Sequence, residues 1–298
     1  MDRRSFMKAG LSVSASALFL PRSLAHAAPP APDLVAVRNG EPAAMFDRGI
    51  EALGGIKAFV KKGEKVLIKP NIGWDVAPER AGNTNPALVA HVIQRCLQAG
   101  AKEVYVFDHT CDNGPRCYRT SGVEEAVKRA GGKIAPGDSE SYYQSVTVTG
   151  GSTLTSAKEH ELILSTDVFI NMPILKTHTS SRVTCCLKNL MGNVWDRGFW
   201  HGNDLHLCIA EYAAYRRPAL NIVDAYNVMK RNGPRGISVD DVQLMKAQIL
   251  STDMVAADVA ATKLLGLDPE RIRHIVLAAE RGVGKKDLGA LTISRIAL

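Results

Sequence analysis

The chain has 298 residues, of which 46% are hydrophobic and 22% are charged, and its formal net charge at pH 7 is +7. A chain of this length buries a full hydrophobic core, as one large domain or two small ones. The positive excess is modest for the length, and no run of lysines and arginines is interleaved with aromatic residues, so the sequence predicts no nucleic-acid partner.

The first residues carry the pattern of a twin-arginine export signal. The pair Arg3-Arg4 is followed, after one spacer, by the aromatic Phe6 and then by Lys8. The apolar stretch at 9–20 is shorter than the roughly 20 residues that a stable membrane-spanning helix needs. An ordinary secretory signal with a chance arginine pair is the alternative, but it does not account for Phe6 and Lys8.

A cleavage site follows this stretch. Ala25-His26-Ala27 has the small-x-small pattern that signal peptidase recognises. We therefore expect residues 1–27 to be removed as a twin-arginine signal peptide, and residues 28–298 to form a single α/β domain. The expected location is the periplasm, with the twin-arginine translocase as a partner during export. No second apolar stretch is long enough for a stable membrane span.

Strand-like and helix-like segments alternate along the rest of the chain. Hydrophobic periodicity, turn residues and helix caps predict the following elements in chain order: a strand at 34–37, a helix at 41–59 interrupted at Gly54-Gly55, a strand at 65–69, a helix from Pro86 to Gly100 with Asn85 as its N-cap, a strand at 103–107, a helix at 121–130, strands at 145–149 and 167–172, helices at 184–190 and 205–215, strands at 220–223 and 248–250, helices at 255–265 and 269–279, and a strand at 291–296.

This order of elements indicates the fold class. Strands separated by helices of about 10–15 residues imply crossover connections and a mainly parallel sheet. Right-handed crossovers place helices on both faces, so we expect a three-layer α/β fold. The strand at 145–149 alternates like a half-exposed strand and fits a hairpin with the segment after 150–151. The segments 109–119 and 192–204 are long Gly-containing loops, which often carry function.

Polar side chains gather where the predicted strands end. In an open α/β sheet, ligands bind outside the carboxyl ends of the strands. We therefore expect the polar residues that follow four of the strands to meet at one edge of the sheet and to form a ligand site. These residues are Lys69, Asn71, Asp108, His109, Lys176, His178 and Asp224.

The two lysines of this set allow two interpretations. Lys69 and Lys176 each follow apolar residues, and burying an isolated ammonium group is costly. In the first interpretation, each lysine pairs with a carboxylate such as Asp108 or Asp224. In the second, the lysines hold an anionic ligand, or one of them has a depressed pKa and acts as a base.

Histidines offer proton transfer and, as an alternative, metal binding. His178 and His109 are the natural candidates for proton transfer, although a loop histidine is more often a plain surface residue. His178 could also join His201, His206, Asp196 and Asp204 in a metal site, but their spacing matches no known motif. The sequence therefore assigns no metal ligands.

The six cysteines do not predict an iron–sulfur cluster, because no Cys-x-x-Cys occurs among them. Cys111 and Cys117 lie in one loop and can pair if the protein is exported to an oxidising compartment. Cys185 and Cys186 are adjacent, which makes a mutual disulfide strained.

Taken together, these motifs resemble a bacterial and archaeal family known as domain of unknown function 362, over roughly residues 34–297. The resemblance rests on Lys69-Pro70-Asn71, Thr84-Asn85-Pro86, Gly100-Ala101, Asp108, Lys176-Thr177-His178, Lys188-Asn189-Leu190-Met191-Gly192, the helix with Asp253 and Asp258, and Gly282-Val283-Gly284. Members often carry twin-arginine signals, and some contain ferredoxin-like segments, which this chain lacks.

The resemblance implies a shared site, but no secure reaction, and the cofactor is unknown. The residues of that site are Lys69, Asn71, Asp108, Lys176, His178, Lys188 and Asn189. With the strand-end pattern, we expect the catalytic residues to be His178, Lys176 and Asp108, and the ligand-binding residues to be Lys69, Asn71, Thr84, Lys188, Asn189 and Asp224. A plainer account of part of this motif is that Lys188 lies near a helix C-terminus that Gly192 ends.

Three functions are compatible with the sequence. The first is an exported enzyme or binding protein for a small anionic molecule, a carboxylate or a phosphate, held by Lys69, Lys176 and Lys188, with His178 transferring a proton and oriented by Asp108 or Asn71. The second is a periplasmic redox or metal/cofactor-maturation accessory protein. The third is a non-catalytic partner of an exported complex.

Overall fold

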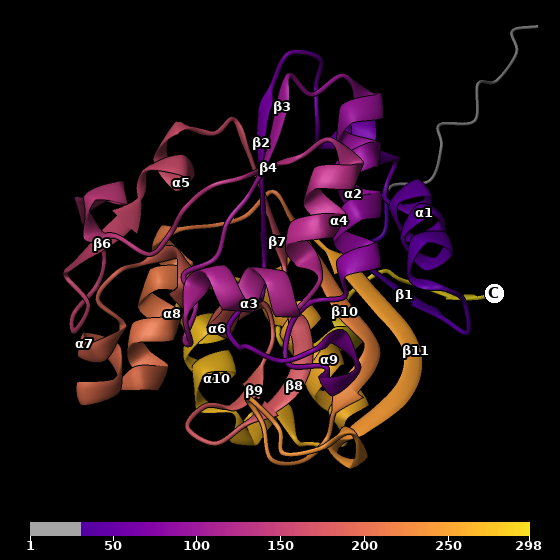
Figure 1. Cartoon of the computed structure of the whole chain (residues 1–298). Coiled ribbons are helices and arrows are strands. Elements are labelled where there is room, and N and C mark those ends of the chain that lie inside the picture. Colours follow the sequence, from indigo (N-terminus) through magenta and orange to yellow (C-terminus); the bar gives the residue numbers. More distant parts are fainter. Residues whose placement is uncertain (1–30) are drawn as a thin grey trace, which may run out of the picture. The chain divides into compact units, whose positions relative to one another are not determined.

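The computed structural model describes residues 31–298 (Figure 1). The strands of this part of the chain form a ten-stranded sheet and a separate two-stranded sheet. The predicted signal peptide at 1–27 lies outside the described residues. The strands are β1 (Leu34–Arg38), β2 (Lys65–Pro70), β3 (Glu103–Val106), β4 (Lys133–Ile134), β5 (Tyr143–Thr147), β6 (Ser156–His160), β7 (Val168–Met172), β8 (Ile174–His178), β9 (Arg182–Thr184), β10 (Leu220–Met229), β11 (Val242–Ser251) and β12 (Ile293–Ala297).

Ten α-helices accompany these strands within residues 31–298. They are α1 (Pro42–Ala52), α2 (Pro86–Ala99), α3 (Gly114–Thr120), α4 (Val123–Ala130), α5 (Glu161–Ser165), α6 (Cys186–Asn189), α7 (Arg197–Gly202), α8 (Leu205–Tyr215), α9 (Met254–Leu265) and α10 (Arg273–Glu280). None of the helices in this part of the chain is long and apolar enough to cross a membrane.

The sheet is mixed but mainly parallel, which confirms the predicted fold class. Its order is β12-β1-β11-β10-β7-β2-β3-β4, with β8 beside β10 and β9 beside β8. The neighbours from β10 through β4 are all parallel, whereas β11 runs antiparallel to both β1 and β10. β5 and β6 form a separate antiparallel hairpin, as the segment at 145–149 predicted.

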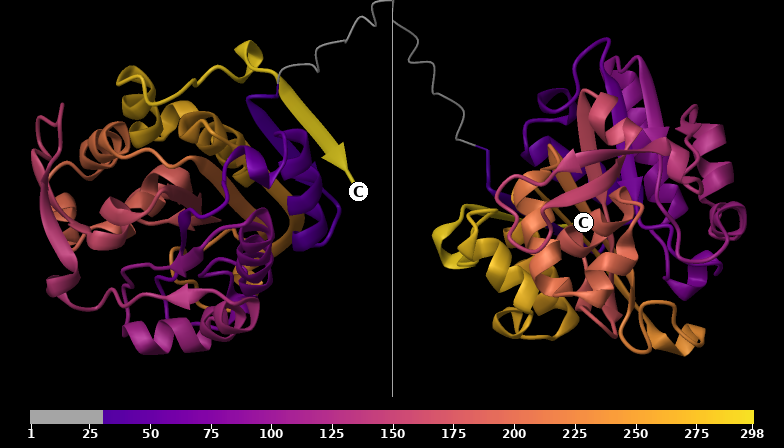
Figure 2. Two further views of the ribbon diagram at one scale, coloured as in Figure 1. Left: turned by 90° about the horizontal axis from the view of Figure 1, so that it is seen from above. Right: turned by 90° about the vertical axis from the view of Figure 1, so that its left-hand side faces the viewer.

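Helices cover both faces of the sheet, so the fold has three layers (Figure 2). Successive side chains of β2 point to opposite faces, and each face has its own apolar core. Val66 and Ile68 pack into one core with α1, α2 and α4. Leu67 packs into the other core with α6, α8, α9 and α10. All three side chains are fully buried. Strands buried on both faces read as continuous apolar runs, as this one does.

The helix ends follow local rules that the sequence displays. The Asn85 side chain accepts a hydrogen bond from the amide of Ala87, and Pro86 occupies the first turn of α2. Gly100 ends α2 in the left-handed region, with φ of 104°. These caps confirm the predicted helix, and they fix where the chain returns to the sheet as β3.

The structure differs from the prediction at several segments. The predicted loops at 109–119 and 192–204 contain the short helices α3 and α7, which begin after the side-chain caps Asn113 and Asp196. Lys176 was expected just beyond a strand, but it lies within β8, which pairs with β10 and β9. The helix expected at 184–190 is reduced to α6 because its first residues belong to β9.

Candidate functional site

A cavity of about 460 Å³ opens beyond the carboxyl ends of β2 and β3. Its wall comes from the ends of β2, β3 and β8, and from α6, α7 and the segment between them. Seven of the residues predicted for the site line it: Lys69, Asn71, Asp108, His109, His178, Lys188 and Asn189. Cys111, Gly192, Arg197 and His201 also line it. The structure therefore brings together residues from distant parts of the chain.

An ion pair forms the floor of the cavity. The Lys69 ammonium lies 2.6 Å from Asp108 Oδ1, and both side chains are buried. Asp108 Oδ2 accepts a hydrogen bond of 2.6 Å from the amide of Ile72. Burial lowers the pKa of Lys69, and the charge of Asp108 opposes that lowering. For Lys69, the structure thus agrees with the interpretation of a paired lysine.

Gly192 lies directly over this ion pair. A Cβ atom at this position would stand 2.0 Å from Asp108 Oδ1 and 2.7 Å from Lys69 Nζ. The Gly192 carbonyl also accepts a hydrogen bond from the amide of His109. A residue without a side chain is therefore needed for close approach, which is a more specific reason for this glycine than helix termination.

A chain of amide side chains connects the lysines. Lys176 Nζ donates to Asn71 Oδ1 at 2.9 Å, and Asn71 Nδ2 donates to Asn189 Oδ1 at 3.0 Å. Asn189 Oδ1 also accepts from Lys69 Nζ at 3.2 Å. Since ammonium groups only donate, they fix which way both amides point. The network holds Asn71 and Asn189 rigidly in the cavity wall.

Lys176 and Lys188 differ from Lys69 because neither forms an ion pair within residues 31–298. Lys176 lies behind Asn71, outside the cavity lining, and donates to Asn71 and to the Gly82 carbonyl. Burial lowers its pKa to about 7. Lys188 lines the cavity, and its ammonium contacts Met191 Sδ at 3.2 Å. Burial lowers the pKa of Lys188 to about 8.

Arg197, at the start of α7, adds a further cation that the sequence analysis missed. Its guanidinium donates to the carbonyls of His109 at 2.9 Å and Thr110 at 2.6 Å, and one nitrogen lies 3.4 Å from Cys111 Sγ. All of these partners are uncharged. The available signal was the segment 192–204, which its length and glycines marked as functional without singling out this residue.

His178 is a neutral hydrogen-bond donor. Its Nδ1 accepts from the amides of Ser180 at 3.1 Å and Ser181 at 3.3 Å, so the ring proton resides on Nε2. Burial, reinforced by the charges of Lys188 and Lys176, lowers the pKa of His178 to about 2. The expected orienting contacts with Asp108 or Asn71 are not formed, because the loop backbone takes that role.

His109 has the opposite tautomer. Its Nδ1 donates to the Val194 carbonyl at 2.9 Å, which leaves Nε2 with a free lone pair. The ring stacks on Trp195 with centroids 4.9 Å apart and planes 2° from parallel. Burial lowers the pKa of His109, and the charge of Arg197 adds to that effect. The cavity therefore presents one imidazole that donates and one that accepts.

Thr84 and Asp224 lie near this edge of the sheet but do not line the cavity. Thr84 Oγ1 donates to the Met172 carbonyl and accepts from the Asn71 amide, both at 2.8 Å. Asp224 accepts from the amide of Asn85 at 2.8 Å and lines a separate pocket of about 120 Å³. Burial raises the pKa of Asp224 to about 6. Both residues hold the loops around the site.

The alternative metal and disulfide arrangements are not formed. Asp196 and Asp204 cap α7 and α8, and His206 Nδ1 lies 3.2 Å from Nδ1 of His274. Cys111 and Cys117 both carry free thiols. Within residues 31–298, one group of three potential metal ligands lies close together: Cys185, Cys186 and Asp258. Their spacing in the sequence does not predict this group.

Solved structures show where this fold occurs. The lactate racemase apoprotein from Thermoanaerobacterium thermosaccharolyticum matches with a TM-score of 0.50 and 10% identity, over 77% of this chain and 56% of the racemase. At that identity the likeness concerns the fold alone, and the chain spans little more than half of the racemase. A protein from Thermotoga maritima matches with a TM-score of 0.40 and 11% identity, over 81% of this chain and 60% of that protein.

Sequence comparison finds a relative with higher sequence identity than these two solved structures. The thylakoid-associated protein sll1697 of Synechocystis is 32% identical over 257 residues, which cover 79% of this chain and 73% of that protein. The family model described as domain of unknown function (DUF362) matches residues 66–263, a span that includes every lysine and histidine of the cavity. The chain therefore belongs to the DUF362 family.

Proposed function

We propose that the protein binds a small anion, a carboxylate or a phosphate, in the cavity beyond the carboxyl ends of β2 and β3. One observation carries the proposal: Lys188 and Arg197 line the cavity, and neither has a carboxylate partner within residues 31–298. A cation withdrawn from water is costly unless a counter-charge compensates it. A bound anion supplies that charge.

The anion would meet donors of three kinds. The Arg197 guanidinium suits planar or bidentate oxygen pairs, Lys188 acts as a point charge, and His178 offers the Nε2 proton. Asp108 does not repel the ligand strongly, because Lys69 neutralises it at 2.6 Å. The fold neighbour is named as a racemase of lactate, a small carboxylate, but the cations of this chain carry the proposal.

The two imidazoles extend the proposal from binding to catalysis. His109 can accept a proton at Nε2, and the neutral His178 can stabilise the developing negative charge by donating a hydrogen bond from Nε2. General acid–base catalysis by a placed side chain contributes about 10²–10⁴-fold. We propose proton transfer on a bound anion as the reaction class, with Lys176 holding Asn71 in position from behind the wall.

Export is a separate part of the proposed function. The pattern from Arg3 to Lys8 supports transport by the twin-arginine translocase, and hence a periplasmic location. Transport in the folded state would allow a ligand or cofactor to be inserted before export.

Ligand-induced stabilisation tests the binding proposal. In the wild-type protein, phosphate or a small carboxylate such as lactate should raise the melting temperature progressively with concentration. The gain is about 2.7 kcal/mol when the anion is present at 100 times its dissociation constant. Lys188→Met and Arg197→Met should abolish the rise while the protein stays folded by circular dichroism.

The matched control is Lys102→Met, which removes an exposed lysine outside the cavity and should leave the rise unchanged. If no anion in a broad screen stabilises the wild-type protein, then the cations of the cavity serve the structure alone and the proposal fails.

A second candidate, a redox or metal-handling accessory protein, is favoured by one observation. Two thiols and a carboxylate converge beside the helix that carries Lys188.

A further inference from the structure

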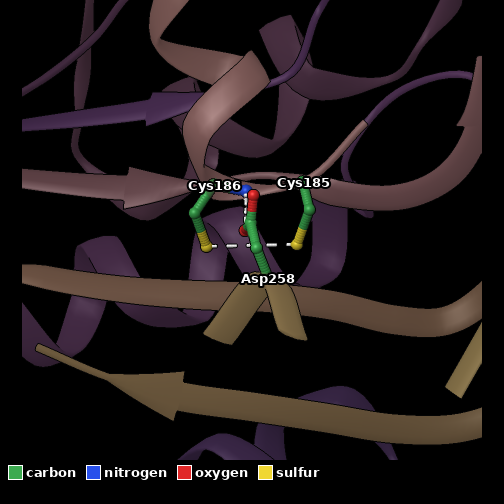
Figure 3. Close-up of side chains that lie close together, drawn as sticks. All are labelled: Cys185, Cys186 and Asp258. Carbon is green, nitrogen blue, oxygen red and sulfur yellow. Dashed lines mark hydrogen bonds between the residues drawn. The ribbon is translucent and has the colours of Figure 1, made fainter. Parts of the chain in front are cut away.

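Three buried side chains converge between α6 and α9 (Figure 3). Cys185 precedes α6, Cys186 is its first residue, and Asp258 projects from the middle of α9. Each offers one ligand atom, and these atoms all lie within 4.8 Å of one another. The side chains are 0% exposed. Residues that are 72 positions apart thus place two sulfurs and one carboxylate oxygen around a common point.

The separation of the sulfurs suits a shared metal ion. Cys185 Sγ and Cys186 Sγ are 4.0 Å apart. Two thiolates bound to one tetrahedral zinc ion, each at about 2.3 Å, stand about 3.8 Å apart. A disulfide needs a sulfur–sulfur distance of about 2.05 Å, and adjacent cysteines reach it only with distortion of the backbone. The observed sulfur–sulfur distance is therefore close to that of two thiolates on one metal ion and much longer than that of a disulfide.

Asp258 lies within reach of both sulfurs and has no cationic partner among residues 31–298. Its carboxylate accepts hydrogen bonds from the amides of Cys186 at 2.7 Å and Leu187 at 3.1 Å. Hydrogen bonds of this kind orient ligating carboxylates in metal sites. Among residues 31–298, no lysine, arginine or histidine forms an ion pair with it, unlike Asp108 on the cavity floor. A fully buried carboxylate without an ion-pair partner gains from a bound metal ion.

We propose that Cys185, Cys186 and Asp258 bind one thiophilic cation, Zn²⁺ or Cu⁺. Two thiols and a carboxylate are ligands that select such ions over Mg²⁺ or Ca²⁺. Two sulfur–metal bonds and one oxygen–metal bond form, and the two thiol protons leave to solvent. No electron is transferred. Two thiolates are too few for an iron–sulfur cluster.

Without a metal ion, the two thiols retain their protons at neutral pH, whereas Asp258 has lost its own. Burial raises the pKa of Cys185 to about 11 and that of Cys186 well above its usual value. Burial also raises the pKa of Asp258 to about 6. Because binding displaces two thiol protons, the apparent affinity for the metal should rise with pH.

The position of the group links it to the anion cavity. α6 begins at Cys186 and ends at Asn189, so the same short helix carries a metal ligand, Lys188 and Asn189. A bound ion would fix the start of α6 and hold the two cavity residues in place. This consequence rests on the proposed anion site, whereas the metal site itself does not.

Metal titration of the reduced, folded full-length chain tests the inference. We expect one equivalent of Zn²⁺ in competition with a chromophoric chelator, or one equivalent of Cu⁺ in competition with bicinchoninate, and the two titrations decide between the ions. Cys186→Ser and Asp258→Asn should weaken binding by about 100-fold or more. Co²⁺ should give a sulfur-to-cobalt charge-transfer band that Cys186→Ser removes.

Cys208→Ser is the matched control, because Cys208 is an equally buried thiol on α8 outside the group. It should bind metal as the wild type does. Circular dichroism shows whether each variant folds, and Cys185→Ser provides a second single-ligand variant. Equal metal binding by wild type and Cys186→Ser, or a Cys185–Cys186 disulfide that withstands mild reductant, would overturn the inference.

Lys188→Met separates the two proposals. This variant should no longer show the anion-induced rise in melting temperature, and it should still bind the metal ion as the wild type does. A chain that binds metal but responds to no anion would refute the proposed function alone, and the reverse result would refute the metal site alone.

Discussion

Gly192 packs its Cα against the Lys69–Asp108 ion pair, and no side chain fits in that space. Gly192→Ala places a methyl group 2.0 Å from Asp108 Oδ1, so the pair must separate or the backbone must move. We expect a loss of about 3 kcal/mol in the free energy of unfolding, as for other disrupted buried ion pairs. Urea unfolding measures it.

Gly202→Ala is the control for this substitution, since no atom lies within 4 Å of a Cβ at that position in α7. The control should stay within about 0.5 kcal/mol of wild type. If the two variants are equally stable, the close packing over the ion pair has no energetic importance.

The charge states of Lys176 and Lys188 set the pH dependence of anion binding. Burial lowers their pKa values to about 7 and about 8, so both ammonium groups are charged below pH 7 and lose their protons as the pH rises through these values. The affinity for lactate, whose own charge is constant above pH 5 or so, should fall between about pH 7 and pH 9. Calorimetric titration measures it.

The bound anion itself raises the pKa of each lysine, which moves the fall in affinity to higher pH than in the free protein. Lys188→Met should abolish binding across this pH range. An affinity that stays level or increases up to pH 9 would contradict the assignment of Lys188 as a charge partner of the anion, with Lys176 as a further charge behind the wall.

Asp224 and α2 show how an element positions the site. Asp224 accepts from the amide of Asn85, the N-cap of α2, and Thr84 beside it holds Asn71 in the cavity wall. Asp224→Ala leaves that partly buried amide without its protein partner, which should cost about 1 kcal/mol of stability. Urea unfolding measures the loss, and Asp138→Ala, at an exposed aspartate, is the control.

Because Asp224 does not line the cavity, its replacement should leave the anion-induced rise in melting temperature unchanged in size. A loss of that rise in a folded Asp224→Ala protein would instead restore the ligand-binding role that the sequence predicted for this residue.

At the level of elements, sequence patterns predict those features that depend only on neighbouring residues. The α2 caps at Asn85 and Gly100 and the apolar run of β2 act within a few residues, and they are where they were expected. The reversed direction of β11 depends on pairing with β1 and β10, from distant parts of the chain, and no local pattern specifies it.

The residues of the site likewise divide into those that the sequence predicts and those that it does not. Position at strand ends was enough to predict that Lys69 and Asp108 would meet. The roles of Arg197 and His178 depend on loop carbonyls and amides that the chain brings together only on folding. Cys185 and Asp258 are likewise joined by the packing of α6 against α9, which leaves no mark on sequence spacing.

Export concerns the whole molecule. The prediction rests on Arg3-Arg4, which lies outside the described residues. Replacing both arginines with lysines should retain the precursor in the cytoplasm, because the twin-arginine pathway recognises the arginine pair. Fractionation and immunoblotting of precursor and mature forms give the measurement.

A strain without the twin-arginine translocase is the control for this experiment. It should retain the wild-type precursor as well. Mature protein in the periplasm of that strain would mean that the general secretory route carries the chain, as in the alternative interpretation of the signal.

The place of β1 in the sheet has a consequence for the order of events in time. Among the strands of residues 31–298, β1 comes first in the sequence, yet its neighbours are β11 and β12, which come last. It cannot pair until residues up to about 297 have been made, and such long-range pairing is slow to form. The strand that follows the predicted signal in sequence is therefore among the last to become ordered. Its incorporation therefore reports that β11 and β12 have been made, and export by the proposed twin-arginine route would have to wait for it.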